Sequence, residues 1–288
     1  FEQMDYAFSK GINFFDTAEL YSIPPTKETC GETNRIIGRW LKKTKKRDQI
    51  IIADKVVGRS GMNWIRPGEQ ETRLNKKQIN SAIENSLRNL QIDHIDIYQL
   101  HWPDRPLNVF SGLEYEYGLS NETAWGTSQY IKLAEKHNIP KPITIQNPYS
   151  LLNRSYEVGL SEISIREKIG LLAYSPLGGG HLTGKYLGGK KPAGSREVLW
   201  GNRFDRYRTL NTEPAVKAYC EVAKKHNIDP AQMAIQFCII QKFVTSTIIG
   251  ATSMDQLKKN IDSIDLSLTN DVIKDINNVQ LKYSNPCP

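Results

Sequence analysis

The chain has 288 residues, of which 39% are apolar and 24% are charged. This composition is typical of globular proteins and excludes wholesale disorder and fibrous architectures. No apolar run reaches the roughly 18–20 residues that a membrane-spanning helix needs, so we expect no membrane partner. The four cysteines show no Cys-x-x-Cys spacing. Their pattern indicates neither a zinc site nor a disulfide framework, we expect no metal, and the chain fits the reducing cytoplasm.

The net charge is +7 at pH 7, from 38 Lys and Arg against 31 Asp and Glu. Such an excess favours anionic partners. No block of five or more like charges is present, as a nucleic-acid-binding arm would show. We therefore expect a solvated basic face and no nucleic-acid partner. A phosphorylated small molecule is the milder alternative.

Short apolar runs alternate with helical patterns along the chain. Strands are predicted at residues 12–16, 50–57, 95–102, 143–147, 170–174 and 244–250, with a further stub at 118–120. Helices are predicted at residues 31–43, 75–91, 123–137, 160–168, 214–226, 230–241, 254–263 and 270–280, and a Gly- and Pro-rich loop at 175–211. Strands alternating with helices predict parallel pairing with right-handed crossovers. Two architectures fit: a (β/α)8 barrel with pieces missing, or an open doubly wound sheet.

Two nucleotide motifs are absent or incomplete. No Gly-x-Gly-x-x-Gly follows the first strand, so the dinucleotide fingerprint of doubly wound folds is missing. Residues 179–186 have the Gly and Lys spacing of a phosphate loop, but Tyr186 stands where Ser or Thr must bind Mg²⁺. This replacement argues against a nucleotide hydrolase.

Unusual polar residues stand at successive strand ends. Asp16 ends the first strand and Tyr21 follows five residues later, Lys55 lies within the second apolar run, and His101 ends the third. Each has an ordinary structural explanation, but Lys is rarely buried without a partner, and Asp16 is a candidate for that partner. Because the carboxyl ends of barrel strands converge on one mouth, we expect the four to act together.

These four side chains make chemical sense as a proton-transfer site. A free tyrosine is a poor acid at neutral pH, and a nearby ammonium lowers its pKa. Asp16 would hold Lys55 in place and keep it charged, and His101 would orient a substrate oxygen or help relay a proton. Tyr21 would protonate a carbonyl oxygen while hydride reaches its carbon. Because side chains supply no hydride, a nicotinamide cofactor is implied.

Later strand ends offer groups that can bind such a cofactor. Gln146 and Asn147 can bond a carboxamide, and the Tyr174 ring can stack on a flat heterocycle. Ser253 and Gln256 match a capping box, and the helix N-terminus it caps suits a phosphate. Further candidates for phosphate or adenine contacts are Lys185, Arg203, Lys258 and Asn260.

The motifs resemble the aldo-keto reductase family. Residues 11–21, GINFFDTAELY, are similar to the family's GxxxxDTAxxY signature. Lys55 on the next strand, the YQLHW run at 98–102 and the segment 248–260 support the resemblance. Residues 118–126, 145–155 and 182–186 are most similar to the family's bacterial Tas-like branch.

The resemblance implies a (β/α)8 barrel, with residues 1–288 as a single domain, that binds NADPH and reduces aldehydes or ketones. By motif position it implies the catalytic tetrad Asp16, Tyr21, Lys55 and His101, with Tyr21 as the proton donor. The cofactor-binding residues that it implies are Ser120, Asn121, Gln146, Tyr174, Ser175, Leu177, Lys185, Arg203, Gly250, Thr252, Gln256 and Asn260. A preference for NADPH over NADH is expected from the positive charge and the segment 252–258.

The sequence departs from the family in two places. The family has a hairpin and a strand before the point where Phe1 stands, and a helix with most of a strand between Tyr117 and Gly118. Such a unit has on the order of 30 residues. A barrel that lost one strand would have an open edge. We therefore expect residues to be missing from the sequence at both points, and a Tyr117–Gly118 Cα distance of about 3.8 Å would refute this for the second.

Two other functions stay open. One is an NADPH-binding, redox-sensing regulatory protein on the same scaffold with little turnover. The other is a different barrel enzyme, such as a phosphosugar isomerase, which would need another carboxylate base and no nicotinamide. Trp64, Trp102 and Tyr149 indicate an aromatic substrate pocket, although surface packing explains them equally well. The sequence indicates neither the substrate nor the oligomeric state.

Overall fold

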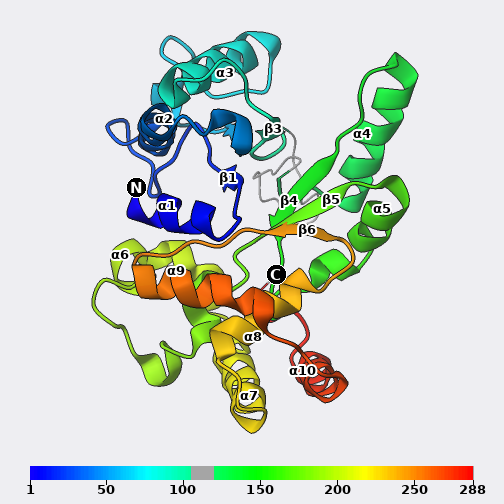
Figure 1. The fold of residues 1–288 in the computed structure, drawn as a ribbon. Coiled ribbons are helices and arrows are strands. Elements are labelled where there is room, and N and C mark those ends of the chain that lie inside the picture. Colours follow the sequence, from blue (N-terminus) through cyan, green and yellow to red (C-terminus); the bar gives the residue numbers. More distant parts are fainter. Residues whose placement is uncertain (105–119, 288) are drawn as a thin grey trace. The chain divides into compact units, whose positions relative to one another are not determined.

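The structure is a computed structural model that describes residues 1–104 and 120–287. The chain divides into two compact units, Phe1–Glu122 and Thr123–Pro288. Each unit has its own three-stranded sheet, and every strand pair within these sheets is parallel (Figure 1). The predicted α/β class with parallel strands is therefore confirmed.

The first unit carries the sheet β1-β2-β3 in chain order. Its strands are β1 (Phe14–Asp16), β2 (Ile51–Val56) and β3 (Ile97–Leu100), and its helices are α1 (Glu2–Ser9), α2 (Glu32–Thr44) and α3 (Lys76–Leu90). Short 3-10 turns lie at Arg47–Gln49 and Asn63–Ile65. Helices α2 and α3 are the crossovers that allow the three strands to run parallel.

Local sequence explains how these elements begin and pack. Asn75 caps α3 as predicted, because its side chain accepts a hydrogen bond of 3.0 Å from the Gln78 amide. Helices α2 and α3 cross at Gly38, where an added Cβ would lie 2.5 Å from the Leu90 carbonyl oxygen. Trp40 is fully buried in the core beneath them, and its indole N–H donates to Asp5 of α1 at 2.8 Å.

The second unit carries the sheet β4-β5-β6. Its strands are β4 (Thr144–Pro148), β5 (Gly170–Tyr174) and β6 (Val244–Thr247). Its helices are α4 (Ala124–His137), α5 (Leu160–Glu167), α6 (Arg196–Trp200), α7 (Thr212–Lys225), α8 (Pro230–Ile239), α9 (Met254–Ile261) and α10 (Asn270–Lys282). A large apolar core, with Leu171, Tyr219 and Phe237 among its buried members, joins the sheet to α4, α5, α7, α8 and α10.

The predicted strands and helices of the described residues are confirmed, with ends that differ by a few residues. The segment predicted as a loop at 175–211 instead contains α6 and 3-10 turns at Gly178–Thr183, Leu187–Gly189 and Gly201–Tyr207. Residues 118 and 119 of the predicted stub, and the junction of Tyr117 with Gly118, lie outside the described residues. The strands that are described form two sheets of three, so the closed eight-stranded barrel stays a prediction.

No helix in the described ranges is both long enough and apolar enough to cross a membrane.

Candidate active site

The first unit gathers four polar side chains at the carboxyl edge of its sheet. Asp16 is the last residue of β1, Lys55 is next to last in β2, and His101 directly follows β3. The ladder continues into His101, whose amide donates to the Val56 carbonyl at 2.9 Å. Tyr21 lies in the loop after β1. Because parallel strands end at one edge, side chains that are far apart along the chain are neighbours here.

Lys55 is fully buried and paired. Its Nζ donates to both carboxylate oxygens of Asp16, at 2.9 and 2.8 Å, and to the main-chain carbonyl of Thr17 at 2.6 Å. Burial is the largest single effect and acts to lower the pKa of Lys55, but the charge and hydrogen bonds of Asp16, together with Tyr21 and Asp54, outweigh it and raise the pKa above its ordinary value. The ammonium therefore keeps its charge, and the predicted Lys55–Asp16 partnership is confirmed.

Tyr21 lies beside this ammonium. Lys55 Nζ is 5.2 Å from the centroid of the Tyr21 ring. Burial raises the pKa of Tyr21 above 10, and the opposing effect of Lys55 is smaller. We expected the nearby ammonium to lower this pKa, and the net direction of that expectation is wrong. Lys55 does lower the pKa, but desolvation of the phenolate raises it by more. Tyr21 keeps its proton at neutral pH.

His101 completes the group as a neutral imidazole. Its ring meets the Tyr21 ring edge-on, with centroids 5.7 Å apart. Burial, followed by the charge of Lys55, holds the pKa of His101 well below its usual range. Its Nδ1 is buried and has no hydrogen-bond partner within the described part of the chain. A neutral ring with a nitrogen left over can bond a small polar ligand.

Ser120 and Asn121, two of the predicted cofactor-binding residues, lie next to His101. The Ser120 amide donates to the Leu100 carbonyl at 3.1 Å. The Asn121 side-chain amide donates to the His101 carbonyl at 3.5 Å and to the Ser120 hydroxyl at 3.3 Å. Their amide and hydroxyl groups therefore lie at the same sheet edge as the four polar side chains.

Apolar side chains surround Tyr21. A small buried cluster of Leu20, Val57 and Ile65 carries, packed against it, Tyr21, Ile23, Cys30, Met62, Trp64 and Trp102. Trp64 and Trp102 thus lie in the cluster that holds Tyr21, as the predicted aromatic pocket requires. Tyr149 does not belong to it. Tyr149 is fully buried in the core of the second unit, where its hydroxyl donates to Glu157 at 2.6 Å.

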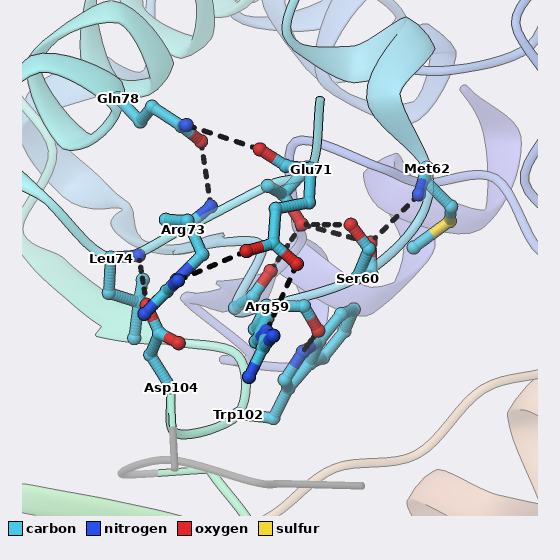
Figure 2. A network of polar contacts seen from close by, with 11 residues as sticks. Arg59, Ser60, Met62, Glu71, Arg73, Leu74, Gln78, Trp102 and Asp104 are labelled. Atoms are coloured by element: carbon cyan, nitrogen blue, oxygen red, sulfur yellow. Dashed lines mark hydrogen bonds and ion pairs between the residues drawn. The ribbon is translucent and has the colours of Figure 1, made fainter. Parts of the chain in front are cut away.

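A polar network joins the loop between β2 and α3 to the residues after β3 (Figure 2). Trp102 Nε1 donates to the Arg59 carbonyl at 2.9 Å. Glu71 accepts from Arg59 and from Arg73, each at 3.0 Å, and Arg73 Nε donates to Asp104 at 2.7 Å. The loop between β2 and α3 is therefore bonded to Trp102 and Asp104, which follow His101 in the chain.

Sequence reasoning missed a second buried ion pair, Glu19 with Arg66. Arg66 donates to both oxygens of Glu19, at 2.8 and 2.6 Å, and both side chains are less than a tenth exposed. Glu19 Oε1 also accepts from the Val57 amide at 2.6 Å. Glu19 stands two residues before Tyr21, so this pair anchors the Tyr21 loop. Glu19 stands inside the DTAELY motif, but no local sequence pattern predicts that Arg66, 47 positions further on, is its partner.

The second unit brings together other predicted cofactor-binding residues at the end of its own sheet. Gln146 lies in β4 and is almost fully buried, while Tyr174 ends β5 and Ser175 follows with φ +56°. The strands are parallel and in register, with Pro148 opposite Tyr174. Leu177 packs against the apolar core. The side chain of Arg203, within Gly201–Tyr207, lies outside the described part of the chain.

Lys185 lies over a glycine turn. Gly178, Gly179 and Gly180 all have positive φ, which residues with a side chain rarely adopt. An added Cβ on Gly180 would lie 3.2 Å from Lys185 Nζ. The absence of side chains lets the ammonium approach the backbone closely, and a cation above a bare glycine turn suits a phosphate group.

The segment from Gly250 to Asn260 is held by its own side chains. Ser253 accepts from the Gln256 amide at 3.3 Å, which confirms the predicted cap of α9. Gln256 Oε1 turns back to accept from the Thr252 amide and hydroxyl, both at 3.1 Å. Asn260 donates to the Gly250 carbonyl at 3.4 Å. The predicted residues of this segment are thus mutual neighbours.

The comparisons with known proteins agree with these motifs. Residues 1–280 match the model of the Aldo/keto reductase family, and the chain belongs to that family. It is 48% identical to protein Tas of Escherichia coli K12 over an alignment covering 99% of this chain and 90% of the relative. The recognition of the family and of its Tas-like branch is confirmed. That alignment has 316 positions against 288 residues, so the relative contains residues that have no counterpart in this chain.

More distant relatives carry different descriptions. An aldo-keto reductase of Babesia bovis is 34% identical over 83% of this chain and 98% of the relative. A probable voltage-gated potassium channel subunit beta of Oryza sativa subsp. japonica is 29% identical over 89% of this chain and 79% of the relative. Membership of the family makes the chain an oxidoreductase of a kind that generally uses NAD(P)H.

In the described ranges, no group of three or more His, Cys, Asp or Glu side chains is arranged to hold a metal ion.

Proposed function

We propose that this protein reduces an aldehyde or ketone to an alcohol with NADPH, and that Tyr21 donates the proton. One observation carries the proposal. A protonated Tyr21 lies beside a charged, buried Lys55 and a neutral His101, in a cluster of apolar side chains. A phenol, an ammonium and an imidazole in this arrangement suit protonation of an oxygen that is gaining negative charge.

Each polar side chain has one task in this chemistry. Tyr21 holds a proton at neutral pH because burial raises its pKa, and it gives that proton to the carbonyl oxygen. Lys55 then stabilises the phenolate that Tyr21 becomes. Asp16 keeps Lys55 charged and fixes its Nζ through two hydrogen bonds. Solvent returns a proton to Tyr21 after the alcohol leaves.

His101 orients the carbonyl. The low pKa keeps its imidazole neutral at pH 7, so it can donate one hydrogen bond without adding a second positive charge beside Lys55. The unpartnered Nδ1 shows that the ring has bonding capacity that no described side chain uses. Trp102, 4.9 Å from the His101 ring, and Trp64 would exclude water from the reacting carbonyl.

By motif position, we assign the binding of a phosphorylated dinucleotide to the following residues. Reduced nicotinamide, when bound, supplies the hydride that goes to the carbonyl carbon. Ser120, Asn121 and Gln146 would hold its carboxamide, and Tyr174 would pack on the ring. Near the pyrophosphate would lie Ser175, Leu177 and Lys185, with Arg203 as a further contributor. The adenosine end would be held by Gly250, Thr252, Gln256 and Asn260, and the net charge of +7 favours the extra phosphate of NADPH over NADH.

We further propose that residues 1–288 form one domain of the (β/α)8 type. Family membership supports this, and so do the parallel strands with helical crossovers. In such barrels the chemistry lies at the carboxyl ends of the strands. The candidate residues follow this rule in each sheet. We also propose a cytoplasmic enzyme, because all four cysteines are free.

The test is to mix the protein with NADPH and a panel of small aldehydes and ketones. Turnover is measured as the loss of the absorbance band of reduced nicotinamide. The parent enzyme is expected to turn over at least one of them. Tyr21→Phe is expected to lose at least about 100-fold in kcat, the usual contribution of a positioned acid, while its Kd for NADPH stays within twofold. Equal, negligible rates in parent and variant would refute the reductase.

The alternative is an NADPH-binding regulator with little turnover. Similarity to a relative described as a probable channel subunit beta favours it. It predicts tight NADPH binding, seen as a change in cofactor fluorescence, without oxidation by any member of the panel. The complete set of Asp16, Tyr21, Lys55 and His101 favours the enzyme, because a pure sensor has no need for a proton donor.

A further inference from the structure

Behind Lys55 lies a chain of buried polar groups that the mechanism above does not use. Three residues form it: Thr17, directly after β1; Asn34, near the start of α2; and Asp54, in β2. All three have no exposed surface. Burying an amide and a carboxylate between a sheet and a helix is costly unless each group is bonded. An apolar set of side chains would fill the same space without that cost.

Each of these hydrogen bonds is donated away from the active site, from Lys55 toward Asp54. Asn34 Nδ2 donates to Asp54 Oδ2 at 3.4 Å, which orients the Asn34 amide. Asn34 Oδ1 then accepts from the Thr17 hydroxyl at 2.5 Å. The main-chain carbonyl of the same Thr17 accepts from Lys55 Nζ at 2.6 Å. That last bond is shorter than either bond from the Lys55 ammonium to Asp16.

The end of the chain at Asp54 is anchored at a cost. Burial raises the pKa of Asp54 to about 6. The charged and titratable groups around it are Lys55 and Glu19, together with the phenols of Tyr98 and Tyr21. The Asp54 carboxylate accepts a hydrogen bond from Asn34. This bond explains why an acidic residue stands at a place in β2 where a charge is unfavourable.

We propose that Asn34 is a positioning residue for Lys55. It holds the Thr17 hydroxyl, and this fixes the peptide whose carbonyl accepts from Lys55 Nζ and so sets the place of the ammonium beside the Tyr21 ring. The proposal rests on the proposed carbonyl reductase, since positioning Lys55 matters through Tyr21. Asn34 and Asp54 do not touch the reacting atoms. They act through Thr17.

Thr17 offers a matched pair of variants. Thr17→Val keeps the volume and removes the hydroxyl, whereas Thr17→Ser keeps the hydroxyl and removes the methyl group. A packing role would tolerate Val and suffer from Ser. A positioning role predicts the opposite order. If Thr17→Val alone does not fold because Asn34 loses its partner, the double variant Thr17→Val/Asn34→Leu replaces both polar groups with apolar ones and tests the same bond.

Two measurements on the full-length protein decide the proposal. The first is the ¹⁵N NMR signal of Lys55 Nζ, assigned with Lys55→Met, and the exchange rate of its ammonium protons. The second is steady-state kinetics with NADPH and a carbonyl that the parent reduces. Thr17→Val is expected to shift the Lys55 signal and speed proton exchange at least about tenfold. It should also lower kcat about tenfold with KM within twofold, as a misplaced group does. Thr17→Ser should show the Lys55 signal, the proton exchange rate and the kcat of the parent.

The two measurements separate this proposal from the reductase itself. An unchanged Lys55 signal in Thr17→Val overturns the positioning role, whatever the rate. A shifted signal with unchanged kcat also overturns it, because the bond then has no consequence for the reaction. A parent without turnover on the whole panel refutes the reductase, and the NMR comparison of Val with Ser still decides whether the hydroxyl sets the place of Lys55.

Discussion

Removing one partner of the Glu19–Arg66 ion pair should be among the most destabilising single changes in the first unit. The two side chains are 7% and 3% exposed and share two hydrogen bonds of 2.6 and 2.8 Å. In Arg66→Met the Glu19 carboxylate stays buried with the Val57 amide as its remaining described partner. Breaking a buried pair on one side costs about 3–5 kcal/mol, because a charge is left without compensation. We expect Arg66→Met to lower the free energy of unfolding by that amount.

The assay is urea unfolding at pH 7, followed by circular dichroism and tryptophan fluorescence. Glu19→Gln should cost about as much as Arg66→Met, because it leaves the guanidinium buried. The double variant should cost only about 1–2 kcal/mol, since both charges are gone and the introduced glutamine side chain can still accept from the Val57 amide. The double-mutant cycle formed by the parent, the two single variants and the double variant should therefore show a coupling energy of about 3 kcal/mol or more.

The control is an exposed pair with similar chemistry. Lys141 and Glu167 lie 3.2 Å apart with side chains 46% and 39% exposed. Lys141→Met should change the free energy of unfolding by no more than about 0.5 kcal/mol, because solvent screens the pair. Two results would refute the reasoning: a loss below about 1 kcal/mol in Arg66→Met, or a double variant that loses the full sum of the two single variants.

Two further predictions concern stability. Burial raises the pKa of Asp54 from 3.8 to about 6, so the folded state holds this proton more tightly than the unfolded state. The protonated Asp54 therefore adds to the free energy of unfolding below about pH 4, and this contribution is lost as the pH rises to about 6. The stability of Asp54→Asn relative to the parent should accordingly grow by up to about 3 kcal/mol between pH 4 and pH 7, and a difference that does not vary with pH in urea titrations would contradict this. Gly38→Ala should lower the free energy of unfolding by about 1–3 kcal/mol and the melting temperature with it, because its Cβ would lie 2.5 Å from the Leu90 carbonyl; unchanged thermal unfolding would show that α2 and α3 can separate freely.

Local patterns predicted the secondary structure because their causes are local. The apolar period of residues 75–91 and the cap at Asn75 specify α3 without any distant contact. The same holds for Ser253 at the start of α9. The segment 175–211 was harder, because its short turns and α6 depend on glycines with positive φ and on packing against the rest of the unit. Sequence periodicity carries no signal for such turns.

The candidate site was predicted in part because parallel strands impose a rule. Polar residues at the ends of β1, β2 and β3 must meet at one edge, so Asp16, Lys55 and His101 were expected together. The partnership of Lys55 with Asp16 followed from charge alone. The net pKa of Tyr21 did not follow, because it is the balance of burial against Lys55 and burial cannot be read from spacing.

The amino-acid sequence by itself determined the family, the alternation of strands and helices, and which residue types stand at the strand ends. Only the tertiary structure decided which buried groups bond to one another. Glu19 with Arg66, and Asp54 with Asn34 and Thr17, join residues 17 to 47 positions apart. The reason is physical: a hydrogen bond requires the donor–acceptor distance to be right within a few tenths of an ångström, and this distance is set by the packing of helices on the sheet.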